Sequence, residues 1–220
     1  MKVISMALLI NHALRYVIDT SIKFSIDESH ALKHSLEVFN YAKEIYDYQI
    51  VQYPFLEKQK EVIFASAILH DMCDKKYMDQ ENGVEMIKHH MKNYLDQEQL
   101  MMLDKIISTM SYSTVKKNGF PDLKEYQMAY HIVREADLLT AYDLDRCLIY
   151  SIMCEKLDYK NALKRVVEIT NNRILKYRSD KLFITNYSKV VSLQLHKKAV
   201  KKVKMLEDTI KTLEDTIKNY

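Results

Sequence analysis

Apolar residues recur at helical spacing along most of the chain. In the segment from Asp27 to Gln49, apolar residues recur at Leu32, Leu36, Phe39, Ala42, Ile45 and Tyr46, mostly three or four positions apart. This spacing places the apolar side chains on one helix face, for which Asp27 or Ser29 is a suitable N-cap. The same pattern predicts helices over residues 57–72, from 84, and over 96–110, 123–142, 145–157 and 161–177. Polar turn segments such as DQENG and KKNGFPD separate them.

Composition points to the same fold class. The 220 residues include only 2 glycines and 2 prolines, and 48% of them are hydrophobic. Sheet proteins need glycine and proline at their many turns, whereas helices mostly avoid both. We therefore predict an all-α protein, a helical bundle with a C-terminal amphipathic helix. Residues 1–178 are expected to form the main helical domain, and residues 179–220 a helical extension.

The C-terminal extension carries a seven-residue repeat, MLEDTIKTLEDTIK. Its apolar positions are spaced 3, 4, 3 and 4, at Val203, Leu206, Ile210, Leu213 and Ile217. Two heptads are shorter than a confident coiled coil requires. Three interpretations stay open: packing of the helix on its own domain, a homodimer through this helix, and nucleic-acid contact through the basic run Lys197–Lys204.

Charge and cysteine usage narrow the class of protein further. A net charge of +3 gives no strong electrostatic case for nucleic acid, which is not expected as a partner. Three cysteines without a CxxC spacing argue against a disulfide framework and fit a reducing, cytoplasmic compartment. No apolar stretch approaches the roughly 18 residues of a membrane span. The opening MKVISMALLINHALRYV is interpreted as an amphipathic helix, because polar residues interrupt its apolar run.

Several polar side chains stand in apolar surroundings. The apolar run of residues 64–69 ends directly in His70 and Asp71, His34 is followed by apolar Leu36 and Val38, and Asp137 precedes two leucines. Burying such groups without partners costs several kcal/mol, roughly 2–7 for a neutral polar group. Two imidazoles and two carboxylates compensate one another if they converge on a divalent cation, because nitrogen and oxygen ligands suit such an ion.

The adjacency of His70 and Asp71 sets a geometric condition. Neighbouring residues in a helix point about 100° apart. Both side chains therefore reach one ion only where the helix ends or bends, and the polar DMCDKK segment after the apolar run supplies such an end.

Three segments are similar to motifs of the HD-domain superfamily of metal-dependent phosphohydrolases, in its small bacterial-type branch. They are DESHALKHSLEVFNYAKEI, AILHDMCDKK and IVREADLLTAYDLDR, and the resemblance covers roughly residues 25–155. It implies an HD-type helical fold and one divalent metal ion, which is Mn, Mg, Co, Ni, Fe or Zn. The implied ligands are His34, His70, Asp71 and Asp137. A second metal is not expected, because few further histidines lie between the motifs.

The resemblance also implies catalytic and substrate-binding residues. Asp74 and Lys75 match the polar pair after the His-Asp dipeptide, where a carboxylate positions water and an ammonium neutralises phosphate. His30 matches a histidine one turn before the first ligand. Arg134 and Lys116 are candidate contacts to substrate phosphate. For each of the five, an ordinary solvated or structural role is the alternative.

The implied activity is hydrolysis of a phosphomonoester or nucleoside phosphate by metal-activated water, with a nucleotide as the favoured substrate. Two alternatives come from other classes. One is a helical ligand-sensing or scaffolding module that keeps the metal site without turnover. The other is a metal oxygenase, which would need a dinuclear iron site and more histidines. The expected partner is a small phosphate-bearing substrate, and no membrane is expected.

Overall fold

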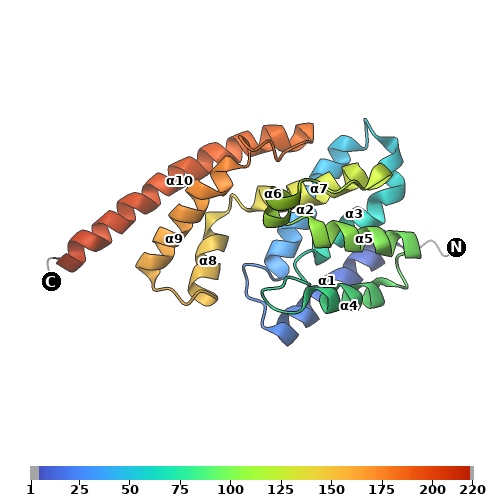
Figure 1. The fold of residues 1–220 in the computed structure, drawn as a ribbon, viewed down its shortest axis with the longest axis horizontal. Coiled ribbons are helices and arrows are strands. Elements are labelled where there is room, and N and C mark those ends of the chain that lie inside the picture. Colours follow the sequence, from blue (N-terminus) through green and yellow to red (C-terminus); the bar gives the residue numbers. More distant parts are fainter. Residues whose placement is uncertain (1–4, 219–220) are drawn as a thin grey trace.

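The computed structural model describes residues 5–218, and this part of the chain is all-α, without a strand (Figure 1). The α-helices are α1 (Met6–Phe24), α2 (Leu32–Gln49), α3 (Lys60–Leu69), α4 (Gln80–Met91), α5 (Gln97–Thr109), α6 (Tyr112–Asn118), α7 (Gln127–Thr140), α8 (Leu144–Met153), α9 (Tyr159–Asn172) and α10 (Asn186–Lys218). Three short 3₁₀ helices accompany them: η1 (Pro54–Gln59), η2 (Lys124–Tyr126) and η3 (Ile174–Lys176). The predicted fold class is confirmed.

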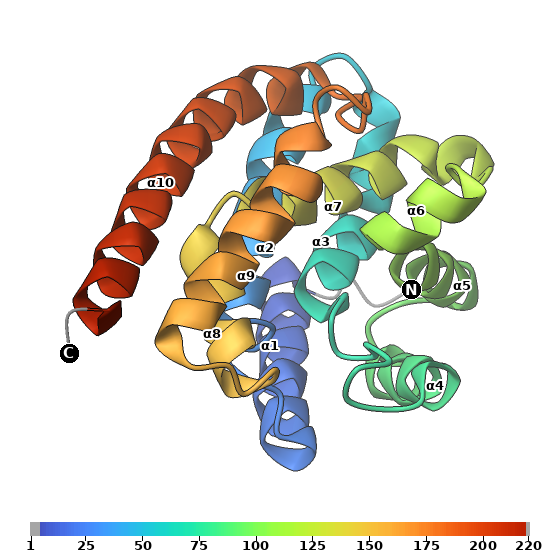
Figure 2. The ribbon, with the colours of Figure 1, turned by 60° about the vertical axis from the view of Figure 1, so that its left-hand side comes forward.

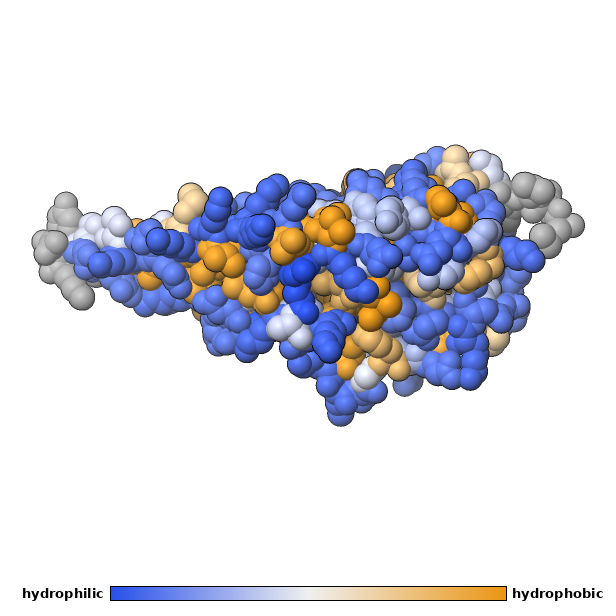
Figure 3. All heavy atoms as spheres, turned by 90° about the horizontal axis from the view of Figure 1, so that it is seen from above, coloured by the Kyte–Doolittle hydropathy of each residue, from blue (hydrophilic) through white to orange (hydrophobic). Residues whose placement is uncertain are grey.

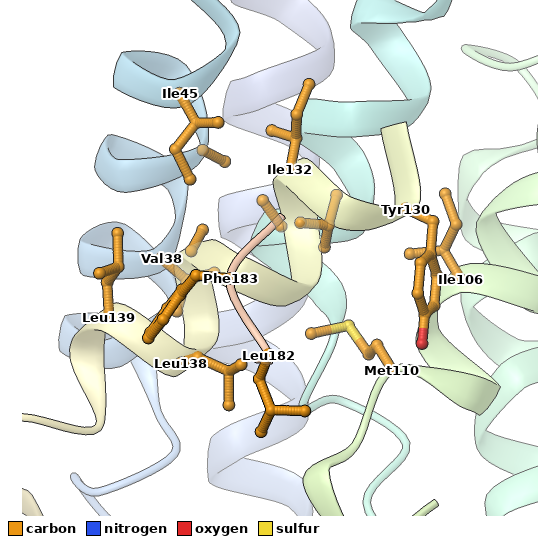
Figure 4. Packing of buried hydrophobic residues seen from close by; sticks show 14 of the residues in the cluster. Val38, Ile45, Ile106, Met110, Tyr130, Ile132, Leu138, Leu139, Leu182 and Phe183 are labelled. Carbon is orange, nitrogen blue, oxygen red and sulfur yellow. The ribbon is translucent and has the colours of Figure 1, made fainter. Parts of the chain in front are cut away.

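Helix α3 lies at the centre of the bundle. All its residues from Val62 to Leu69 are buried, and it packs against α1, α2, α5 and α7. One apolar core fills the space between α3 and α1, α4 and α5. A second core joins α2, α3 and α7, and it continues to Leu182 and Phe183 in the segment before α10 (Figure 4). A helix that is apolar on all sides is expected in such a central position.

Helix α10 runs along the outside of α9 and extends away from the rest of the bundle (Figures 1 and 2). Ala199 and Val203 on this helix are buried in the same core as α2 and α7, and Leu206 is half-buried against it. Nearer the end, Lys164 of α9 forms an ion pair with Glu214 at 2.5 Å. The heptad positions Val203 and Leu206 therefore pack on their own chain, and the core continues across residue 179. A homodimer through this helix stays a prediction.

The structure differs from the predicted helices at several ends. Helix α2 begins at Leu32 and not near Asp27, because the Asp27 carboxylate accepts a hydrogen bond from the Ser29 backbone N–H and stabilises a turn. The 57–72 helix is divided into η1 and α3. Helix α6 was not predicted. Ser111 caps its start by accepting from Thr114 N, and Gly119 ends it with a φ of 75°, a conformation that favours glycine.

Polar side chains cover most of the face seen from above, with smaller groups of apolar side chains between them (Figure 3). In the described range, no helix combines the length and the apolar character that crossing a bilayer requires. The three cysteines are free thiols.

Candidate metal centre

Three helices bring four ligand-type side chains together. His34 is the third residue of α2, His70 and Asp71 directly follow α3, and Asp137 lies in α7. His34 Nε2 is 3.0 Å from His70 Nε2, 3.1 Å from Asp71 Oδ2 and 3.5 Å from Asp137 Oδ1. One ligand atom each from His34, His70 and Asp137 lies within 4.8 Å of the others, a separation that one bound metal ion could bridge.

The end of α3 explains how two adjacent residues reach the same place. The last helical residue is Leu69, and His70 is the C-cap. His70 Nε2 lies 3.4 Å from Asp71 Oδ1, so both side chains turn toward the cluster. The turn that follows, with Asp74 N donating to Asp71 O, carries the polar DMCDKK segment away from the apolar core. The geometric condition set by the sequence is met here.

Burial and charge act against each other in this cluster. His34 is 1% exposed and His70 6%. Burial alone would raise the pKa of Asp137, but the hydrogen bond from His34 and the charges of His70 and Arg146 outweigh it and hold that pKa below its usual range. Burial would lower the pKa of His70, yet Asp71 and Asp137 raise it to about 9. The two carboxylates therefore stay ionised, and they stabilise a positive charge on His70 or on a bound cation in its place.

Hydrogen bonds show how far the cluster is suited to a metal. His70 Nδ1 donates to the Ala67 carbonyl at 2.9 Å, so a neutral His70 presents the Nε2 lone pair to the cluster. Asp71 Oδ2 is buried and has no well-aligned hydrogen-bond donor among the described residues, with His34 Nε2 3.1 Å away. Both features fit a cation. His34 differs, because its Nδ1 accepts from Arg146 Nη1 at 2.8 Å. Ligation through His34 Nε2 requires Arg146 to turn away, so that Nδ1 can carry the proton.

Two cavities adjoin the cluster. The smaller, of about 180 Å³, is lined by His70, Asp71 and Asp137. The larger, of about 460 Å³, lies along α8 and α9. Four residues line both cavities, namely His30, Lys76, Arg146 and Arg173. Three of the four candidate ligands thus face a space that is also lined by four cationic side chains, Lys75, Lys76, Arg146 and Arg173.

Asp74 and Lys75 line the smaller cavity, and their catalytic role stays a prediction. The neighbouring Lys76 makes the more specific contacts. Its Nζ lies 3.0 Å from His30 Nε2, 3.4 Å from Asp74 Oδ2 and over the Tyr150 ring. Of the two lysines, Lys76 is the one held at the site.

His30 lies in the turn before α2 and not one helical turn before His34. His30 is 5% exposed. Its burial is the main reason why its pKa is lowered to about 3, and the charge of Lys76 adds to this effect. A neutral His30 accepts the Lys76 hydrogen bond at Nε2. Its protonated Nδ1 then lies 2.6 Å from Ser29 Oγ and 3.2 Å from the Tyr77 hydroxyl.

The structure places two predicted substrate contacts, Arg134 and Lys116, away from both cavities. Arg134 is 1% exposed, and its Nη2 donates to the Leu182 carbonyl at 2.5 Å and to Glu135 at 3.2 Å. It lines neither cavity, because it is engaged in joining α7 to the segment before α10. Lys116 forms an ion pair with Asp180 at 2.8 Å and also lines neither cavity.

Sequence reasoning missed two cations at the site. Arg146 stands nine residues after Asp137 within the last quoted motif, so its proximity in sequence was an available signal. Besides His34, it contacts Thr140 Oγ1 at 3.0 Å and Asp137 Oδ1 at 3.6 Å. Arg173 lies beyond the segment of family resemblance, and no motif marks it. Its Nε donates to the Tyr177 hydroxyl at 3.1 Å.

No protein-family model matches this chain, and no curated protein or solved structure is significantly similar to it. What the site does is therefore inferred from its own residues.

Proposed function

We propose that this protein is a metal-dependent phosphohydrolase that acts on a phosphomonoester, with nucleoside phosphates among the candidate substrates. The observation that carries the proposal is the convergence of His34, His70, Asp71 and Asp137 beside a cation-lined cavity. The motifs similar to those of the HD-domain superfamily contain these four residues and support the same activity.

The chain supplies both halves of a phosphate site. A divalent cation held by the four ligands would acidify a water molecule and polarise a phosphate oxygen. Lys76, Arg146 and Arg173 face the same space from other elements, and their charges neutralise the phosphate and the charge that develops on attack. Arginine suits this task because its planar guanidinium binds two phosphate oxygens at once.

Asp74 is the candidate group for proton transfer. It follows Asp71 by one turn and lines the smaller cavity. Its Oδ1 accepts from the Lys76 backbone N–H at 2.9 Å, which holds the carboxylate in place. A carboxylate in this position can orient a water molecule and take its proton. Beside Asp74, we propose that Lys75 helps to neutralise phosphate charge and that His30 positions the Lys76 ammonium.

The test is turnover of a panel of phosphate esters, including nucleoside 5′-monophosphates, by the full chain with Mn²⁺. Loss of a residue that only hydrogen-bonds to a metal ligand typically lowers metal affinity or activity by about 10- to 100-fold. Because His70 is a candidate ligand itself, His70→Ala is expected to reduce both Mn²⁺ affinity and hydrolysis by more than that. The matched control is His89→Ala, because His89 is an exposed histidine on α4. Circular dichroism separates a lost site from a lost fold.

Three outcomes contradict the proposal. They are hydrolysis that is equal in both variants, Mn²⁺ binding that survives in His70→Ala, and metal binding without turnover of any ester. The last result would favour the ligand-sensing alternative. Two irons per chain on metal analysis would favour the oxygenase alternative.

A further inference from the structure

The larger cavity is formed by two helix faces. On α9 and just after it, the lining residues recur at helical spacing, at Arg165, Glu168, Ile169, Asn172 and Arg173. On α8 and just before it, they are Asp143, Arg146, Cys147 and Tyr150. Residues three and four apart share a helix face. The α8–α9 hairpin therefore presents one wall of the cavity, and His30 and Lys76, which contact Tyr150, also line it.

The wall changes in charge along its length. Near the metal ligands it carries Arg146 and Arg173. At the other end, Arg165 forms ion pairs with Glu155 at 3.3 Å and Glu168 at 2.9 Å. Two carboxylates against one guanidinium leave that end with one negative charge. Among the described residues, no group hydrogen-bonds to the second carboxylate oxygen of Glu155, Oε2.

The two ends are separated by a distance suited to a small organic molecule. Arg165 and Arg173 are eight residues apart on one helix face, which corresponds to roughly 12 Å. Between them the wall is made by Cys147, Tyr150 and Ile169, whose thiol, ring and alkyl group favour a carbon skeleton over a charged one.

We propose that this cavity binds the organic part of the substrate and that the acidic end selects phosphomonoesters carrying a hydrogen-bond donor, above all an amine, on the order of 10 Å from phosphorus. The proposal rests on the proposed phosphohydrolase activity. The phosphate group is bound at Lys76, Arg146 and Arg173, and the donor reaches Glu155 and Glu168. An ester with a second anionic group at that distance is rejected by the same carboxylates.

A series of synthetic esters that differ only at the far end tests this selectivity. Hexyl phosphate ends in a methyl group, 6-hydroxyhexyl phosphate in a neutral donor and 6-aminohexyl phosphate in a cation, while hexane-1,6-diyl bisphosphate ends in an anion. Hydrogen bonds to charged groups are worth roughly 1.5–3 kcal/mol, so the amine is expected to exceed the methyl compound about tenfold or more in kcat/KM. The hydroxyl compound should lie between them, and the bisphosphate should be the poorest.

The double variant Glu155→Gln/Glu168→Gln keeps the size of both side chains and removes their charge. It is expected to lower the ratio of kcat/KM for the amine over the methyl compound to about 1, because only the amine uses the carboxylates. Glu207→Gln on the exposed face of α10 is the control, and it should keep the tenfold ratio. The ratio within each variant corrects for any general loss of activity.

Binding measurements distinguish failure of this inference from failure of the proposed function. Calorimetric titration with hexyl and 6-aminohexyl phosphate reports the preference even without turnover. If no ester is hydrolysed but the amine binds more tightly and the double variant loses that preference, the phosphohydrolase proposal fails and the cavity assignment stands. If the four esters react and bind equally well, or if the double variant keeps the preference, the cavity assignment is overturned.

Discussion

Arg146 Nη1 donates a hydrogen bond to His34 Nδ1 at 2.8 Å. A guanidinium has no acceptor, so a neutral His34 in this arrangement carries its proton on Nε2, the nitrogen that faces His70 and the two carboxylates. Metal ligation through that nitrogen needs the other tautomer. Arg146 thus contacts a candidate metal ligand and also lines the cavities proposed to bind phosphate, so the two proposed functions of the site would compete for one side chain.

Replacing Arg146 should affect metal and phosphate in opposite directions. In Arg146→Gln, the amide oxygen can accept from His34 Nδ1–H, and a positive charge beside the ligands is removed. We expect Mn²⁺ to bind about tenfold more tightly, a change of about 1.4 kcal/mol, while inorganic phosphate binds more weakly. Calorimetry with each ligand measures both, and Arg15→Gln, at an exposed i,i+4 pair on α1, is the control. Weaker Mn²⁺ binding in Arg146→Gln would refute this role.

Metal binding should release a proton at neutral pH. Asp71 and Asp137 outweigh burial and raise the pKa of His70 to about 9, so His70 is mostly protonated at pH 7 in the metal-free protein. In that state His34 Nε2, 3.0 Å from His70 Nε2, accepts the hydrogen bond, and His34 carries its own proton on Nδ1 with Arg146 turned away. A metal must displace the extra proton of His70, and the apparent affinity should therefore rise about tenfold per pH unit up to about 9. Titration in two buffers of different ionisation enthalpy counts the protons released. A constant affinity between pH 7 and 9 would show that His70 is already neutral.

Buried neutral histidines should make the protein less stable in mild acid. Burial lowers the pKa values of His30 and His131 to about 3, whereas an unfolded histidine titrates near 6.5. Between these values the unfolded chain binds more protons, so stability is full above pH 6.5 and falls as the pH decreases toward 3.

His131 allows this effect to be isolated, because it lies away from the metal ligands, beside Gln127 and Arg134. In His131→Gln, the loss of unfolding free energy between pH 7 and pH 5 should be smaller than in the parent by about 2 kcal/mol. Urea unfolding at both pH values measures it. His89→Gln should leave the loss as it is, since His89 is exposed. An unchanged pH dependence in His131→Gln would contradict the interpretation.

Arg134 should matter for stability and not for the site. Arg134→Met leaves Glu135 buried without its cationic partner, although Ile184 N and Thr185 still donate to that carboxylate. We expect a loss of about 3 kcal/mol in unfolding free energy, the lower end for a broken buried ion pair. Mn²⁺ affinity should not change. If Arg134→Met instead stays stable and loses only phosphate binding, the prediction that Arg134 contacts the substrate would be supported.

The fold class and the four candidate ligands could be predicted from local sequence properties. The scarcity of glycine and proline argues against a protein rich in turns, and this conclusion does not depend on knowing which residues are in contact. His70-Asp71 at the end of an apolar run and Asp137 before two leucines were conspicuous because a charged or polar group in an apolar helix face carries a cost wherever the helix packs. Such an unfavourable placement can be recognised within a single segment of the sequence, without knowing which helices pack together.

The other site residues depended on which helices face one another. Periodicity shows that a helix face is buried, but it does not say against which partner. Nothing in the local sequence therefore indicated that Arg173 lines the same cavities as Lys76, or that Arg134 donates to the Leu182 carbonyl. Long cationic side chains are especially hard to place from the sequence, because their charged ends lie several bonds from the backbone and their positions depend on the surrounding groups. The tertiary packing of α8, α9 and α10 on the bundle therefore decided which cations reach the candidate metal centre.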